Sequence, residues 1–175
     1  METVTFVDGF GRAVQVKKDG VVTSASKGNS AKDENVMIVS GRNVYDAFGR
    51  VAKAFYPTTE GTGSKSTFNK SFDNVSPTVT VYDVLDRATS VTLPDNSTTT
   101  TAYTVDNGSH ALVTTVTDAL HNVQATHTNG SDKTLKTIQK SGPDGDITTS
   151  FEYDGIQRLV RVTDTEGNVT TSTYD

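Results

Sequence analysis

The sequence of 175 residues contains no cysteine and no tryptophan, and only 3 histidines and 4 prolines. Without cysteine, the chain can form neither disulfide bonds nor thiolate metal sites. Its apolar runs fall well short of the roughly 20 residues that a membrane-spanning helix needs, so we expect no membrane insertion. Met1 precedes a polar, strand-like segment instead of a charged region with an apolar core, so no signal peptide is expected.

Positive charge and hydrophobic residues are also scarce. The 16 Lys and Arg residues are outnumbered by 21 Asp and Glu, which gives a formal net charge of −5. Because nucleic-acid binding needs a basic surface, and no basic stripe runs along the chain, nucleic acid is not an expected partner. Only 33% of the residues are hydrophobic, which predicts a thin core and favours a sheet with one solvated face.

What the sequence does contain is a motif that recurs along its whole length. Its clearest copy reads Tyr-Asp-Gly-Ile-Gln-Arg at 153–158. Counted from the Asp, a large apolar residue follows at the second position, Arg or Asn at the fourth, and another apolar residue at the fifth. The aspartates that start these copies are Asp8, Asp46, Asp83, Asp118 and Asp154. A fixed period is the signature of a repeat architecture.

The spacing of the copies predicts strands and turns. The aspartates stand 38, 37, 35 and 36 residues apart, and weaker copies between them give one turn about every 10 to 14 residues, enough for one strand and one turn. No segment shows helical spacing over three turns. We therefore predict an all-β protein, an elongated, twisted antiparallel sheet built from consecutive β-hairpins. From residue 78 onward, strands are expected near 78–83, 87–93, 98–105, 111–117, 122–128, 133–140, 146–153, 158–163 and 168–174.

The N-terminal part of the sequence is less regular. Residues 2–7 and 12–17 are predicted to be paired strands, and the polar stretch 24–35 is predicted to be a loop. The segment 57–71 is rich in Gly, Ser and Thr, which predicts a flexible insertion. Because the motif continues on both sides of that segment, we predict a single repeat array over 1–175, a fragment of a larger protein.

Each position of the motif has a local structural explanation. The Asp carboxylate is expected to accept hydrogen bonds from backbone N–H groups two or three residues later and so to close a turn. The apolar residue at the second position is expected to fold back under the turn. The Arg can pair with a carboxylate across the turn or in the next repeat, and its stem can lie across an aromatic ring. The Tyr before the Asp offers packing area and a polar tip.

The pattern Tyr-Asp-x-x-Gly-Arg, followed by Pro-Asp-Gly and a further Tyr-Asp, resembles the YD repeats of the RHS family. The resemblance is carried by 45–50, 82–87, 143–145 with 153–154, and 174–175. It covers most of the chain and is weakest at 20–36 and 57–72. The motif residues to which we assign a structural role are Tyr45, Asp46, Gly49, Arg50, Tyr82, Asp83, Arg87, Asp118, Tyr153, Asp154, Arg158, Tyr174 and Asp175.

This resemblance implies a bacterial protein, secreted or exposed at the cell surface, whose hairpins spiral into a hollow shell around a toxic C-terminal domain. Relatives of this kind include toxin-complex subunits and the animal teneurins. The implied partners are the neighbouring repeats of the parent polypeptide and an enclosed toxin polypeptide. RHS shells often end in a self-cleaving segment with an Asp-Pro pair. Here the prolines follow Tyr56, Ser76, Leu93 and Gly142, so the resemblance implies the scaffold without the protease.

Catalytic and metal sites find little support in the sequence. His121 and His127 could serve a nucleophile–base pair or a zinc site, but no cysteine or suitably spaced carboxylate accompanies them. His110 is the remaining histidine. The run Asp144-Gly145-Asp146 could offer oxygen ligands to Ca²⁺ but lacks the further acidic ligand of a calcium loop. We therefore expect no enzyme activity, no cofactor and no metal.

The expected function is structural, a segment of an RHS-type β-shell or stalk that encloses or presents another polypeptide such as a toxin domain. The alternative is a cell-surface adhesion module that binds a glycan or a protein. In that case, the repeated Asp and Arg could form a binding stripe, and the tyrosines an aromatic platform: Tyr45, Tyr82, Tyr103, Tyr153 and Tyr174. Their recurrence at equivalent places favours packing between repeats. A hydrolase hidden in the loops is the remaining alternative.

Overall fold

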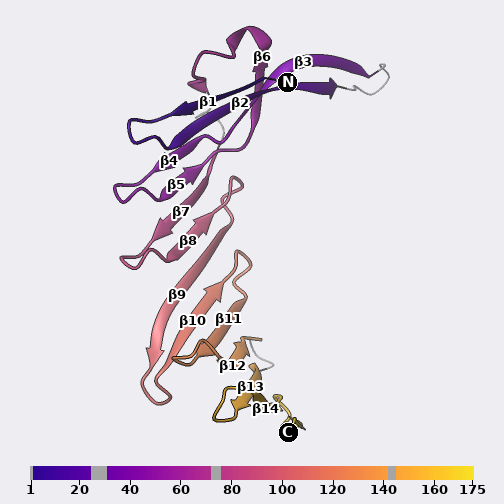
Figure 1. Cartoon of the computed structure of the whole chain (residues 1–175). Coiled ribbons are helices and arrows are strands. Elements are labelled where there is room, and N and C mark those ends of the chain that lie inside the picture. Colours follow the sequence, from indigo (N-terminus) through magenta and orange to yellow (C-terminus); the bar gives the residue numbers. More distant parts are fainter. Residues whose placement is uncertain (1, 25–30, 72–75, 142–144) are drawn as a thin grey trace. The chain divides into compact units, whose positions relative to one another are not determined.

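The computed structural model describes residues 2–24, 31–71, 76–141 and 145–175 (Figure 1). These residues form antiparallel β-strands and one short 3-10 helix, η1 (Thr62–Ser64), with no α-helix in the described ranges. The predicted all-β fold of consecutive antiparallel strands is therefore confirmed. No helix in the described part of the chain is long and apolar enough to span a bilayer.

The strands belong to two open sheets, where the sequence pattern predicts one. The first has the order β1-β2-β3-β6 and consists of β1 (Thr3–Val7), β2 (Ala13–Ser24), β3 (Lys32–Ser40) and β6 (Thr58–Gly61). The second has the order β15-β14-β13-β12-β11-β10-β9-β8-β7-β5-β4. It starts with β4 (Asn43–Tyr45), β5 (Val51–Ala54), β7 (Thr78–Tyr82), β8 (Ala88–Thr92) and β9 (Thr98–Asp106). It continues with β10 (Ala111–Thr117), β11 (Val123–Thr128), β12 (Thr134–Gln139), β13 (Ile147–Tyr153), β14 (Leu159–Thr163) and β15 (Val169–Thr171).

Every strand predicted from residue 78 onward is present, with ends displaced by a few residues at most. In Figure 1 the strands from β9 onward follow one another as hairpins in chain order. The N-terminal pair is also present, although β2 extends beyond the predicted end to Ser24. The loop predicted over 24–35 is wrong from Lys32 onward, because that part pairs with β2, and residues 25–30 lie outside the described ranges.

The chain divides into two compact units, which we describe separately. The first comprises Met1–Val81 and Val91–Ser97, and the second Tyr82–Ser90 and Thr98–Asp175. That the chain is a single array, as the repeats suggest, stays a prediction.

The core of the first unit lies where β2, β3 and β6 pair. Val36, Met37 and Val39 on β3 are buried there. On β2, Gln15 and Lys17 are completely buried while Lys18 is exposed, which follows the two-residue period of a strand. The buried side of this sheet therefore contains polar as well as apolar side chains.

The segment 57–71 is a packed part of the first unit and not a bare linker. Its residues Thr58–Gly61 form β6, which pairs with β3 through Val36 to Val39. Hydrogen bonds from β2 also reach Asn69 within the same segment. That the segment is an insertion in the repeat array stays a prediction.

The second unit has a thin core, as its composition suggests. Its buried apolar residues are Ala111, Val113 and Ala125 on β10 and β11. Threonines occupy matching places on consecutive strands, with Thr114 opposite Thr126 and Thr126 opposite Thr137. Backbone pairing along the ladder and β-branched side chains therefore account for much of this unit.

Candidate functional site

Each motif aspartate begins a hairpin turn that is closed by the same two backbone hydrogen bonds. In the turn at Asp154, the Asp154 N–H donates to the carbonyl of Arg158 (2.9 Å), and the Gln157 N–H donates to the carbonyl of Asp154 (3.0 Å). The same bonds close the turns at Asp8, Asp46, Asp83 and Asp118. Register shifts occur beside three of these turns, in the pairs β1–β2, β4–β5 and β13–β14. This pattern is that of a type I turn followed by a bulge.

The aspartate carboxylate gathers three further hydrogen bonds in every complete copy. Oδ1 of Asp154 accepts from the backbone N–H of Ile156 (3.0 Å) and of Arg158 (2.8 Å), and Oδ2 accepts from Nε of Arg158 (2.7 Å). The copies at Asp8, Asp46 and Asp83 have the same three bonds. The donors are thus two and four residues after the Asp, while the third N–H binds the main-chain carbonyl.

These hydrogen bonds lower the pKa of the motif carboxylates. The backbone and side-chain hydrogen bonds from Arg158 lower the pKa of Asp154, and the side chain of Asn122 does so at Asp118. At Asp46 partial burial raises the pKa, but the hydrogen bonds from Arg50 outweigh it and the net change is a lowering. Each carboxylate is therefore ionised at neutral pH and engaged within its own turn.

The motif arginine also reaches the next hairpin. The guanidinium of Arg12 lies 4.2 Å from the ring centre of Tyr45, that of Arg87 lies 4.0 Å from Tyr103, and that of Arg158 lies 4.6 Å from Tyr174. Such stacking of a cation on an aromatic face is attractive. One arginine therefore joins the aspartate of its own turn to a tyrosine of the following hairpin, and we call this arrangement the Asp-Arg-Tyr link.

The tyrosine hydroxyls complete the link. In each case the hydroxyl donates to the carbonyl of the residue just after the fourth-position cation. The pairs are Tyr45 to Ala13 (2.9 Å), Tyr103 to Ala88 (3.3 Å), Tyr153 to Thr134 (3.0 Å) and Tyr174 to Leu159 (2.8 Å). Packing of these tyrosines between neighbouring repeats is thereby confirmed. Of the other motif residues, Tyr82 ends β7, and Asp175 accepts a main-chain hydrogen bond from Arg158 (3.4 Å).

The apolar residue at the second position does not fold under the turn, and that prediction is wrong. Phe10 is 86% exposed, Phe48 82% and Leu120 82%. This position lies at the apex of the turn, so the side chain points away from the sheet. The guanidinium of Arg12 lies 5.2 Å from the Phe10 ring centre, and that of Arg50 lies 4.9 Å from Phe48.

The third position always has a left-handed backbone conformation. Two copies use glycine there, with φ of 78° at Gly11 and 82° at Gly49. The other copies place Asp86 (61°), His121 (66°) and Gln157 (67°) at this position. The turn type is therefore unchanged where glycine is missing, although a residue with a Cβ costs roughly 1–2 kcal/mol in that conformation.

A turn that the sequence analysis missed runs from Asn129 to Lys133. It has the same backbone bonds as the Asp turns, and Oδ1 of Asn129 accepts from the N–H groups of Ser131 (2.9 Å) and Lys133 (2.9 Å). The signal was present, because an amide residue at the first position and a cation at the fourth match the motif offsets.

The cluster around Lys17 was also missed. The ammonium of Lys17 donates to the Glu60 carboxylate, to the Ser64 carbonyl (2.8 Å) and to the Thr67 carbonyl. All three of its protons therefore have acceptors, which offsets the cost of burying a charge. Asn69 continues the cluster by donating to Glu60 (2.8 Å) and by exchanging hydrogen bonds with Gln15 (2.9 and 3.1 Å). These contacts hold the segment 57–71 against β2.

The histidines occupy turn and strand positions. His110 has φ of 55° in the turn after β9, and His127 on β11 places Nδ1 3.9 Å from Oδ2 of Asp106. No group of three His, Cys, Asp or Glu that could hold a metal occurs among the described residues. Asp144, part of the calcium alternative, lies outside the described ranges, and Asp146 is paired with Lys140.

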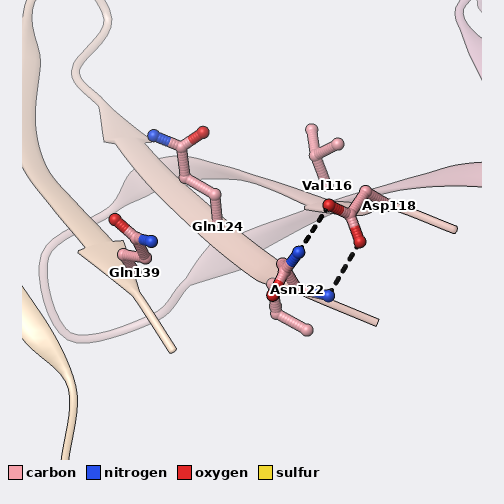
Figure 2. Close-up of a pocket in the computed structure, with 6 residues that line it drawn as sticks. Val116, Asp118, Asn122, Gln124 and Gln139 are labelled. Carbon is pink, nitrogen blue, oxygen red and sulfur yellow. Dashed lines mark hydrogen bonds between the residues drawn. The ribbon is translucent and has the colours of Figure 1, made fainter. Parts of the chain in front are cut away.

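A hollow of about 380 Å³ lies on β10, β11 and β12 (Figure 2). Its lining residues are Val116, Asp118, Asn122, Val123, Gln124 and Gln139. Figure 2 shows Asp118 engaged with Asn122, as in the other turns. Gln124 and Gln139 face each other across β11 and β12, and their side-chain amides make no hydrogen bond within the described part of the chain. The hollow therefore offers free amide groups but no nucleophile beside a base.

Residues 1–103 match the family model described as a domain of unknown function, DUF6443. The chain belongs to the DUF6443 family. The matched part includes the turns at Asp8, Asp46 and Asp83 and the cluster around Lys17. A search of curated proteins found no match to this DUF6443 chain.

Solved structures share the fold of this DUF6443 chain. TcdB2-TccC3-Cdc42 is 17% identical with a TM-score of 0.63, TcdB2-TccC3 is 18% identical with 0.63, and TcdB2-TccC3 without its hypervariable C-terminal region is 18% identical with 0.62. Each comparison covers 93% of this chain, which spans 9% of the length of the other. At this level of identity the likeness shows the fold alone.

Proposed function

We propose that this chain is a structural repeat scaffold, a segment of an RHS-type β-shell or stalk that encloses or presents another polypeptide such as a toxin domain. The observation that carries the proposal is the Asp-Arg-Tyr link. The aspartate and arginine of the motif bind each other, and the arginine continues to the tyrosine of the next hairpin. The charged groups of the repeat are thus used to join hairpins, as a scaffold requires.

The similar structures support the same proposal. The fold of TcdB2-TccC3 matches 93% of this chain, yet the match covers only 9% of that longer polypeptide. A hypervariable C-terminal region is present in that protein and was removed in one of its structures. By analogy, we propose that the parent polypeptide is bacterial, secreted or surface-exposed, and that further repeats and a variable domain accompany this segment.

Limited proteolysis of the polypeptide encoded by the whole gene tests this function. A domain enclosed by the repeats is expected to resist a protease that cleaves the same domain when it is expressed alone. Equal cleavage rates in the two contexts would argue against enclosure. A linked variant, Arg87→Ala with Arg158→Ala, should increase cleavage of the enclosed domain, whereas Lys136→Ala, which leaves the links intact, should not.

An adhesion module remains the second candidate, and the hollow in Figure 2 is the observation that favours it. Free carboxamides can both donate to and accept from sugar hydroxyls. The double variant Gln124→Ala and Gln139→Ala should then abolish binding on a glycan array. His127 and Lys136 are paired on the same two strands three residues away, and so on the opposite face. Their double alanine variant is the matched control, and an array with no bound glycan would rule out this candidate.

A further inference from the structure

The chain contains two Asn-Gly-Ser sequences, and both lie in hairpin turns of the second unit. One is Asn107-Gly108-Ser109, between β9 and β10, and the other is Asn129-Gly130-Ser131, between β11 and β12. An Asn followed by Gly can lose its side-chain amide when the glycine nitrogen attacks the Asn Cγ, because glycine has no Cβ to block the approach. The two turns present the same three residues in different hydrogen-bonding environments, which do not depend on the proposed function.

In the Asn129 turn, the groups that would take part in this attack are favourably placed. Oδ1 of Asn129 accepts two backbone hydrogen bonds, from Ser131 and from Lys133, both at 2.9 Å. The N–H of Gly130 donates to no acceptor within the described residues. A Cβ built at Gly130 would have no atom within 4 Å, so the approach to this nitrogen is open.

The two donors on Oδ1 form a small oxyanion hole. When a nitrogen adds to Cγ, negative charge develops on Oδ1, and donors about 2.7–3.1 Å away stabilise it. The N–H groups that hold the carboxylate of an Asp turn thus hold the reacting oxygen of the amide at Asn129.

The Asn107 turn has the opposite arrangement. The N–H of Gly108 donates to Oδ1 of Asp106 (3.0 Å), and a carboxylate acceptor stabilises the protonated form of this nitrogen. The side-chain oxygen of Asn107 accepts no hydrogen bond from the described residues. The nucleophile is therefore occupied and the carbonyl is not activated.

We propose that Asn129 is a site of spontaneous deamidation, promoted by its own turn. The Gly130 nitrogen loses its proton to solvent and bonds to Cγ of Asn129, the bond from Cγ to Nδ2 breaks, and ammonia leaves. Water then opens the cyclic imide, so that one water is consumed and one ammonia released. Opening at Cγ places an aspartate at position 129, and opening at the main-chain carbonyl gives isoaspartate.

The aspartate product completes the repeat motif at this turn. An Asp at position 129 has Lys133 at the fourth position, where the other turns have Arg12, Arg50, Arg87 and Arg158. The carbonyl after this cation already accepts the hydroxyl of Tyr153. Deamidation would therefore convert an uncharged turn into one with the carboxylate and cation of the Asp-Arg-Tyr link.

Peptide mapping by mass spectrometry tests this inference with Asn107 as the internal control. The 175-residue chain is incubated at neutral pH, folded or unfolded in guanidinium chloride, and the deamidation rates at Asn129 and Asn107 are compared. Asn129→Asp supplies the marker for the aspartate product. We expect the rate ratio of Asn129 to Asn107 to be higher in the folded chain, by roughly tenfold or more. A folded ratio equal to or below the unfolded ratio would overturn the proposal.

Discussion

At the scale of the residue, the aspartate of the motif closes the turn by itself, and the arginine adds the connection to the next hairpin. Asn129 separates the two roles, because its amide oxygen keeps both backbone donors without a carboxylate. The charge of the aspartate therefore serves the bond to the cation at the fourth position.

Replacing Asp154 should show these two contributions separately. Asp154→Ala removes the acceptors of three hydrogen bonds and is expected to lower the melting temperature by several degrees. Asp154→Asn keeps the acceptor for the two backbone donors and should have a smaller effect. Glu166→Ala removes an exposed carboxylate that closes no turn and is the control. An Asp154→Ala loss no larger than that of the control would contradict the role of the carboxylate.

The third position offers a stabilising substitution. Gln157 has φ of 67°, so glycine would relieve a strain of roughly 1–2 kcal/mol, partly offset by about 0.4–1 kcal/mol from the more flexible unfolded chain. Gln157→Gly should therefore raise the free energy of unfolding by about 0.5–1 kcal/mol. Ile156→Gly, at the neighbouring exposed position with ordinary φ, should lower it. Chemical denaturation measures both, and the same sign for the two would be contrary to this account.

At the scale of the element, hairpins could be predicted because their determinants lie within five residues. The bonds from Asp154 reach only to Arg158, so the motif contains all the partners. The Lys17–Glu60 pair joins residues 43 positions apart, and no local pattern indicates that a lysine on β2 is buried. The exposure of Phe10 and Phe48 was missed because apolar character alone does not show which side of a turn a residue takes.

The Lys17 cluster makes a prediction about the attachment of β6. Lys17→Met leaves the Glu60 carboxylate and the carbonyls of Ser64 and Thr67 without their buried partner. Because removing one member of a buried pair is costly, the free energy of unfolding should fall by about 3 kcal/mol. Lys18→Met, at the adjacent exposed position, should change it little. Equal losses in the two variants, measured by guanidinium unfolding, would show that the cluster does not hold the segment.

At the scale of the whole molecule, many turns depend on ionised carboxylates. The pKa is lowered at Asp8, Asp46, Asp83, Asp95, Asp106, Asp118, Asp154 and Asp164. Repetition makes these small local effects additive along the chain, as expected when each repeat contacts mainly its neighbours. A repeat array therefore concentrates its response to pH in one type of group.

The sign of the pH response follows from the direction of these shifts. A carboxylate with a lowered pKa in the folded state binds protons first in the unfolded chain, so its contribution is present above the unfolded value and lost as the pH falls through the folded one. The denaturation midpoint should thus be nearly constant from about pH 7 to 5 and decrease below about pH 4. Asp154→Asn should reduce this decrease. A midpoint that does not change below about pH 4 would refute the role of the turns.

The connection between hairpins is tested most directly by a double-mutant cycle on Arg87 and Tyr103, whose groups lie 4.0 Å apart. The single variants Arg87→Ala and Tyr103→Ala are compared with the double variant by denaturation, and Arg161 with Tyr103 provides an unlinked control pair. We predict a favourable coupling of about 0.5–1 kcal/mol for Arg87 and Tyr103. A coupling equal to that of the control pair would contradict the claim that the Asp-Arg-Tyr link joins successive hairpins.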